Sequence, residues 1–139
     1  MNKTLGIVAW NANGLLKHIQ ELEIFLNLQN IDICLISETH FTKTSYCKLR
    51  GFICYHALHP ENKARGGSAI FVKENIQHNE QLKIEKISMQ VSTIKVFSSK
   101  TKSYSISAIY CPPRHNLKQE EYITLLKTLG SEFLIGGVF

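Results

Sequence analysis

The stretch Ile31–His40, which reads IDICLISETH, decides the fold class of this sequence. Its first six residues, Ile31–Ile36, form a nearly continuous apolar run of strand length, which is typical of a strand buried on both faces. The polar residues Ser37–His40 follow directly. In open α/β proteins the chemistry usually lies just past the carboxyl end of such a strand. Glu38 and His40 are therefore the first candidates for a functional site.

The residues before this strand predict a strand–helix–strand unit. Leu5–Trp10 (LGIVAW) is another apolar run of strand length, and the turn-forming residues Asn11–Gly14 follow it. Apolar residues then recur at steps of three and four over residues 15–28, which predicts an amphipathic helix. The two strands of such a unit are parallel, so we expect Asn11 and Glu38 at the same rim of a sheet.

The middle of the chain predicts short strands separated by loops rich in Pro, Asn, Lys and Gly. These strands are expected at Phe52–Ala57, Gly67–Val72, Ile87–Phe97 and Tyr104–Tyr110.

A second strand–helix–strand pattern ends the chain. A helix is expected after Pro113, with Asn116 as its N-cap and Gln119 as the partner in a capping box. Phe133–Ile135 then predicts a closing strand, and Gly136-Gly137 predicts a turn after it. Two helices and six or seven strands indicate a layered α/β architecture.

Composition favours one globular domain. The chain has 139 residues, of which 44% are hydrophobic, and this is enough for one core of ordinary size. No apolar run reaches the roughly 18 residues that a membrane span needs, and the N-terminus lacks a signal-peptide pattern, so we expect an intracellular protein without a membrane partner. The four cysteines form no C-x-x-C pair, which predicts reduced thiols rather than disulfides or a zinc site.

Net charge weakly favours a polyanionic partner. The formal charge is +5 at pH 7, and basic side chains gain affinity for nucleic acids by releasing counterions from phosphates. The basic residues are scattered rather than gathered in a tail, so charge alone does not decide the matter.

Three residues at strand ends are candidate metal or phosphate groups. The carboxylate of Glu38 suits a hard cation such as Mg²⁺; the alternative is a solvated loop residue that pairs with a lysine. Asn11 and Asn13 offer amide oxygens to a metal and NH₂ groups to a phosphate. An Asn-Gly turn needs no ligand, however, and is the alternative for both asparagines.

Other candidates carry the same ambiguity. Tyr110 ends a strand, so its hydroxyl can face the same rim, or the ring can be a half-buried core aromatic. Arg65 precedes two glycines and Arg114 follows two prolines; each can contact a phosphate or belong to an ordinary turn. His40 is either a phosphate contact or a structural loop residue.

Four motifs in this order resemble one known family. They are Trp10–Gly14 (WNANG), Ile36–His40 (ISETH), Arg65–Ile70 (RGGSAI) and Ile109–Pro113 (IYCPP). Together they resemble the endonuclease/exonuclease/phosphatase superfamily, which includes the apurinic endonucleases and pancreatic deoxyribonuclease. The nearest resemblance is to the endonuclease domain at the front of jockey-like, non-LTR (LINE-type) retrotransposon polyproteins, and it runs from about Leu5 to Phe139.

The resemblance implies a four-layer α/β/β/α sandwich over residues 1–139 and Mg²⁺-dependent nicking of target DNA, with Mn²⁺ as the alternative ion. By residue matching, Asn11 helps to orient the scissile phosphate, and Glu38 binds the metal with Asn13 nearby. Tyr110 contacts the phosphate, while His40, Arg65 and Arg114 contact DNA. An intact element is expected to carry a reverse transcriptase domain as well, and a working enzyme is expected in the nucleus.

One departure from the family pattern affects the expected activity. The family continues its last strand with Gly-Asp-Phe-Asn, whereas this chain has Gly137-Val138-Phe139. The matching Asp is therefore Val138, and the family's Asn and its later Asp-His pair have no counterpart here. We expect a sandwich that is incomplete at the C-terminus and a hydrolase by ancestry whose rate is strongly impaired, since a positioned proton-transfer group contributes ~10²–10⁴-fold.

Two other functions remain open at this point. A non-catalytic remnant would bind nucleic acid or another partner through Arg65, Arg114 and nearby lysines, with a steep salt dependence. A phosphatase or exonuclease of the same superfamily is the third alternative, and the details of Ser37–His40 and Tyr110–Pro113 favour the retrotransposon branch over it.

Overall fold

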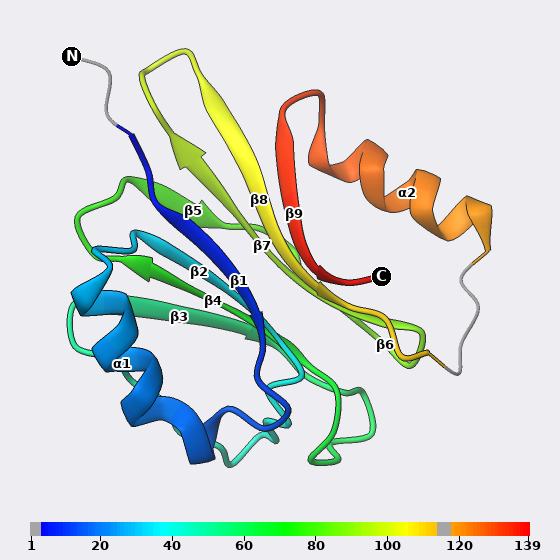
Figure 1. The fold of residues 1–139 in the computed structure, drawn as a ribbon. Coiled ribbons are helices and arrows are strands. Elements are labelled where there is room, and N and C mark those ends of the chain that lie inside the picture. Colours follow the sequence, from blue (N-terminus) through cyan, green and yellow to red (C-terminus); the bar gives the residue numbers. More distant parts are fainter. Residues whose placement is uncertain (1–3, 114–117) are drawn as a thin grey trace.

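The computed structural model describes residues 4–113 and 118–139, which form two sheets and two α-helices (Figure 1). In chain order the elements are β1 (Ile7–Asn11), the 3-10 helix η1 (Leu16–His18), α1 (Ile19–Leu28), β2 (Ile33–Ser37), β3 (Phe52–Ala57), β4 (Ser68–Lys73), β5 (His78–Glu80), β6 (Ile84–Lys86), β7 (Met89–Phe97), β8 (Ser103–Tyr110), α2 (Gln119–Leu129) and β9 (Phe133–Val138).

The first sheet has the strand order β1-β2-β4-β3. β1 and β2 are parallel and α1 connects them, which confirms the strand–helix–strand unit predicted at the start of the chain. The helix packs its apolar stripe on the outer face of this sheet, where Leu22 and Leu26 join one buried cluster with Cys34, Ile36 and Phe71. Burial of the Cys34 thiol raises its pKa to about 12, so this residue is a small apolar core group.

The second sheet has the order β5-β7-β8-β9, with β6 also paired to β7. β7 and β8 are antiparallel, whereas β8 and β9 are parallel and joined through α2. Leu125 and Leu129 of this helix pack in one cluster with Val91, Ile109 and the half-buried Ile135.

The inner faces of the two sheets pack on each other. Side chains alternate along each strand, so residues that point away from the helices meet in the centre. This central core contains Leu35 and Ile70 from the first sheet and Ile94, Val96 and Ile106 from the second. The two helices cover opposite outer sides of the pair of sheets (Figure 1). The predicted α/β/β/α layering is thereby confirmed.

The last strand differs from its prediction. Gly136 and Gly137 were expected to form a turn, but they lie within β9 and pair with Ala108 and Ile109 of β8. A Cβ on Gly136 would lie 2.8 Å from Leu35 Cδ1, so the strand approaches the first sheet more closely than a side chain allows. Glycine here marks close packing rather than a chain reversal.

Other differences are small. The prediction omitted β5 and β6, which have three residues each, because such short polar segments lack an alternating pattern. Helix α2 begins at Gln119, and its N-cap is Lys118, whose backbone N–H donates to the Glu121 carboxylate at 3.3 Å. Asn116, the predicted cap, lies outside the described residues. In the two described ranges, no helix is both long and apolar enough to cross a membrane.

Candidate active site

A cleft of about 460 Å³ lies where the carboxyl ends of β2 and β8 meet. It brings together four of the residues singled out in the sequence: Glu38, His40, Arg65 and Tyr110. Three of them lie in two loops of the first sheet, after β2 and before β4, and Tyr110 ends β8 of the second sheet, so the packing of the two sheets creates the cleft. Its complete lining is Glu38, His40, His59, Arg65, Gly66, Ile87, Tyr110, Pro112 and Pro113.

Backbone hydrogen bonds fix the first-sheet side of the cleft. The N–H of Glu38 donates to Gly67 O at 2.8 Å, and the N–H of His40 donates to Gly66 O at 2.9 Å. The carbonyl of Glu38 in turn accepts from the N–H of Gly14 at 2.8 Å. Glu38 and His40 have φ values of 57° and 59°, a left-handed conformation that is unfavourable for residues with a Cβ. Non-glycine residues in this conformation are commonly found at functional sites.

Glu38 and Tyr110 are linked across the two sheets. Both side chains line the cleft. Burial raises the pKa of Tyr110 to about 12, and the charge of the Glu38 carboxylate and hydrogen bonding to it add to this shift. The hydroxyl therefore keeps its proton at neutral pH and serves as a hydrogen-bond donor beside a carboxylate.

The two asparagines lie at the same rim but do not line the cleft. Asn11 ends β1 beside Ser37, and its Oδ1 accepts from the backbone N–H of Asn13 at 3.1 Å. This turn leads into Gly14, where a Cβ would lie 3.3 Å from His40 Nδ1. Both asparagines are exposed. Arg114 lies outside the described residues.

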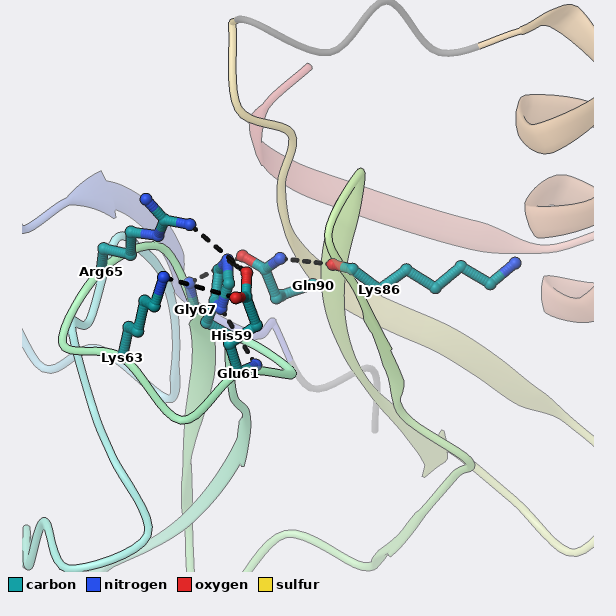
Figure 2. A network of polar contacts seen from close by, with 7 residues as sticks. All are labelled: His59, Glu61, Lys63, Arg65, Gly67, Lys86 and Gln90. Carbon is teal, nitrogen blue, oxygen red and sulfur yellow. Dashed lines mark hydrogen bonds and ion pairs between the residues drawn. The ribbon is translucent and has the colours of Figure 1, made fainter.

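Sequence analysis missed two buried polar residues next to the cleft. His59 is only 5% exposed and lines the cleft. Gln90 is fully buried on β7; its Oε1 accepts from Gly67 N–H at 2.9 Å and its Nε2 donates to Lys86 O at 2.6 Å (Figure 2). Gln90 thus connects the second sheet to the glycine turn beside Arg65. No local motif distinguishes either residue, because both depend on contacts between segments far apart in the chain.

The donor set fits a magnesium ion with few protein ligands. Among the residues that the structure describes, Glu38 is the only carboxylate in the cleft lining, and no group of three or more His, Cys, Asp and Glu residues is placed to hold a metal. Mg²⁺ retains several waters and is often bound by only one or two carboxylates, with oxygen donors preferred. Glu38 supplies the one carboxylate of this minimal requirement, and water would have to complete the coordination.

Val138 occupies a position directly beside the cleft residues. In the parallel register of β8 and β9 it pairs with Tyr110, and its carbonyl accepts from Cys111 N–H at 2.9 Å. Its side chain can neither bind a metal nor transfer a proton.

Comparison with solved structures identifies the class of fold. The structure superposes on the endonuclease domain of TRAS1, a telomere-specific non-LTR retrotransposon, with a TM-score of 0.68 and 17% identity, covering 94% of this chain and 58% of that one. It also superposes on an endonuclease/exonuclease/phosphatase family protein from Leptotrichia buccalis with a TM-score of 0.64 and 11% identity, covering 96% of this chain and 66% of that one. The chain therefore has the endonuclease/exonuclease/phosphatase fold.

Sequence comparison narrows the resemblance further. The chain is 34% identical over 134 residues to the RNA-directed DNA polymerase from mobile element jockey of Drosophila melanogaster. This match covers 96% of the chain and 14% of the relative, so the chain spans about one seventh of the curated relative's length. No family model matches the sequence. The predicted resemblance to jockey-like retrotransposon polyproteins is confirmed.

Proposed function

We propose that this chain is the first part of a non-LTR retrotransposon endonuclease domain, one that evolved to nick target DNA with the help of Mg²⁺ or Mn²⁺. The observation that carries the proposal is the cleft shared by the two sheets, in which the Glu38 carboxylate lies close enough to Tyr110 to contribute to its raised pKa. The similarity to a jockey polyprotein and the fold of the TRAS1 endonuclease domain support it. In an intact element a reverse transcriptase domain accompanies this domain, and the site of action is nuclear DNA.

We assign a separate role in binding a phosphodiester to each of these residues. Glu38 holds the metal with Asn13 nearby, and a bound Mg²⁺ would stabilise negative charge on the phosphate oxygens. Tyr110 turns its single O–H from Glu38 to the phosphate, and this hydroxyl stays protonated at neutral pH. Asn11 orients the phosphate from the β1 side.

Basic side chains hold the rest of the DNA strand. His40 and Arg65 line the same cleft as Glu38, so they can contact the backbone on either side of the reacting phosphate. Arg114, outside the described residues, is proposed as a further DNA contact.

Catalysis by this chain is weak because Val138 stands where the family has an aspartate. The register places Val138 beside Tyr110, so an aspartate there would adjoin the phosphate. The chain also spans only 58% of the TRAS1 domain, and the edge strands β1 and β9 expose Ile7, Trp10, Phe133 and Leu134. Further strands of a complete domain would cover these apolar side chains.

Metal binding tests the proposal without relying on activity. Mn²⁺ titrated into the ¹⁵N-labelled chain should broaden the backbone amide signals of Glu38, Tyr110 and their neighbours. Glu38→Gln should abolish this broadening, whereas Glu74→Gln, an exposed acid after the far end of β4, should not. Equal broadening in the Glu38→Gln variant would contradict the assigned metal site.

A plasmid assay tests the impairment. We expect Mg²⁺-dependent nicking at or near background for the unaltered chain. Robust nicking that Glu38→Ala abolishes would show that the site is active as it stands.

A non-catalytic nucleic-acid-binding remnant is the second candidate, and the apolar side chain of Val138 beside Tyr110 favours it. In that case the chain binds DNA with a steep salt dependence, and Glu38→Gln leaves both binding and its salt dependence unchanged or slightly strengthened, because one negative charge is removed.

A further inference from the structure

Three basic side chains converge on one carboxylate beside the cleft (Figure 2). Glu61 Oε2 lies 3.3 Å from Lys63 Nζ, while Glu61 Oε1 lies 3.5 Å from an Arg65 guanidinium nitrogen and 4.0 Å from His59 Nε2. His59 Nδ1 accepts from the Glu61 backbone N–H at 3.2 Å, so the neutral imidazole carries its proton on Nε2. That N–H is on the ring edge nearest the Glu61 carboxylate.

His59, Lys63 and Arg65 together form what we call the basic cluster. One of its members is buried, and the other two are exposed together with Glu61. The His59 side chain is 4% exposed, whereas Glu61, Lys63 and Arg65 are 45%, 54% and 56% exposed. An ion pair at such exposure changes an equilibrium constant by a factor of about five or less. The Glu61 carboxylate can therefore leave its partners at little cost, while the buried His59 stays in place.

The basic cluster adjoins the cleft that we assign to the reacting phosphate. His59 and Arg65 line that cleft together with Glu38 and Tyr110. A nucleic-acid strand with one phosphate at Glu38 would bring a neighbouring phosphate to the basic cluster. A phosphodiester group presents two terminal oxygens, as a carboxylate does, and arginine binds either with two parallel hydrogen bonds.

We infer that His59, Lys63 and Arg65 form a second phosphate-binding subsite, and that the Glu61 carboxylate occupies this subsite until a nucleic-acid phosphate displaces it. The inference rests on the proposed function, because it takes the ligand to be a strand bound in the cleft. Glu61 then acts as an internal competitor that weakens binding. It also keeps the three basic side chains oriented when no strand is bound.

Removal of the Glu61 charge tests the inference. Binding of a fluorescein-labelled DNA duplex is measured by anisotropy at low salt for the unaltered chain, Glu61→Gln and Glu74→Gln. Glu74→Gln removes the same charge about 20 Å away, beyond the opposite end of the six-residue strand β4, and therefore corrects for net charge. We expect Glu61→Gln to bind about three- to fivefold more tightly than Glu74→Gln, since the strand no longer displaces a carboxylate.

A double variant separates the subsite from general electrostatics. In the Glu61→Gln background, Arg65→Ala should remove the gain, because the competitor and the phosphate share this guanidinium. Salt-sensitive binding by the unaltered chain, with Glu61→Gln no tighter than Glu74→Gln, would overturn the subsite and leave the proposed DNA binding intact. Absence of binding in all of these proteins would overturn the proposed DNA binding, and the subsite with it.

Discussion

The molecule contains two strand–helix–strand units that end at the same cleft, and only one of them brings a carboxylate to it. In both β1–α1–β2 and β8–α2–β9 the two strands are parallel neighbours. The register pairs Asn11 with Ser37 in the first unit and Tyr110 with Val138 in the second.

The hydrogen bonding just past each pair is the same. Ala12 N–H donates to Ser37 O in the first unit, and Cys111 N–H donates to Val138 O in the second, both at 2.9 Å. In both units, backbone hydrogen bonds therefore hold two strand ends side by side at the rim. The side chains differ: the first unit continues into Glu38, whereas the second offers the hydroxyl of Tyr110 and an apolar valine.

Burial also distinguishes the closing strands of the two units. Every residue of β2 is buried, because this strand lies inside the first sheet between β1 and β4. β9 is the edge strand of the second sheet, and its residues Phe133 and Leu134 are 41% and 46% exposed. The closing strand of the first unit is therefore a buried inner strand, whereas that of the second is an exposed edge strand. The opening strands show the reverse, since β1 is mostly exposed and β8 mostly buried.

The largest effect should come from giving the second unit its missing carboxylate. Val138→Asp places an acidic group beside Tyr110, and we expect Mg²⁺-dependent plasmid nicking to rise roughly 10²-fold or more over the unaltered chain. The rate of conversion from supercoiled to open-circular plasmid measures this change.

Val138→Asn is the matched control, since asparagine has nearly the same size as aspartate but carries no charge. Glu38→Gln in the Val138→Asp background should return nicking to background. If Val138→Asp binds DNA yet nicks no faster than the unaltered chain, position 138 does not limit the reaction. The missing carboxylate of the second unit would then not explain weak catalysis.

The same truncation in both closing strands should have unequal effects on stability. Leu35 on β2 is 1% exposed and lies between the sheets, so Leu35→Ala should lower the free energy of unfolding by about 2–5 kcal/mol. Leu134 on β9 is 46% exposed, so Leu134→Ala should cost about 1 kcal/mol or less. Urea denaturation followed by circular dichroism compares the two variants, and similar losses would mean that β9 is as well packed as β2 in solution.

Much of the fold could be predicted because apolar patterns are local. The prediction for β3 matched at both ends, and those for β2, β4 and β8 shifted by a residue or two. β9 was predicted too short, because Gly136-Gly137 is typical of a turn. Its glycines are instead required by the approach of Leu35 and the backbone of Ile109, which are distant in the sequence.

The candidate site likewise contains residues that local sequence patterns predict and residues that they do not. Glu38 and Tyr110 follow apolar strands, so their place at a rim could be predicted from local pattern alone. His59 and Gln90 could not, since the sequence around them carries no motif and their contacts arise only when the two sheets pack. Roles for all of these residues stay predictions until the metal and DNA experiments are done.

The smallest expected effect concerns a half-buried histidine of the first sheet. His56 on β3 packs edge-on against Phe41, with ring centroids 5.8 Å apart, and its Nδ1 is buried. Burial and the nearby charge of Lys83 lower its pKa, although Glu85 and Glu80 partly oppose this shift. The folded chain therefore holds the neutral imidazole at pH values where the unfolded chain has already taken up a proton.

Stability should consequently be highest above the unfolded-state pKa, about 6.5, and should fall as the pH drops below that value. His56→Phe keeps an aromatic ring against Phe41 but removes the titrating group. The free energy of unfolding should therefore depend less on pH in this variant. Urea unfolding of both proteins at pH 7.5 and pH 5.5 measures the difference. An identical loss of unfolding free energy in the two proteins would mean that protonation of His56 is not what destabilises the fold in acid.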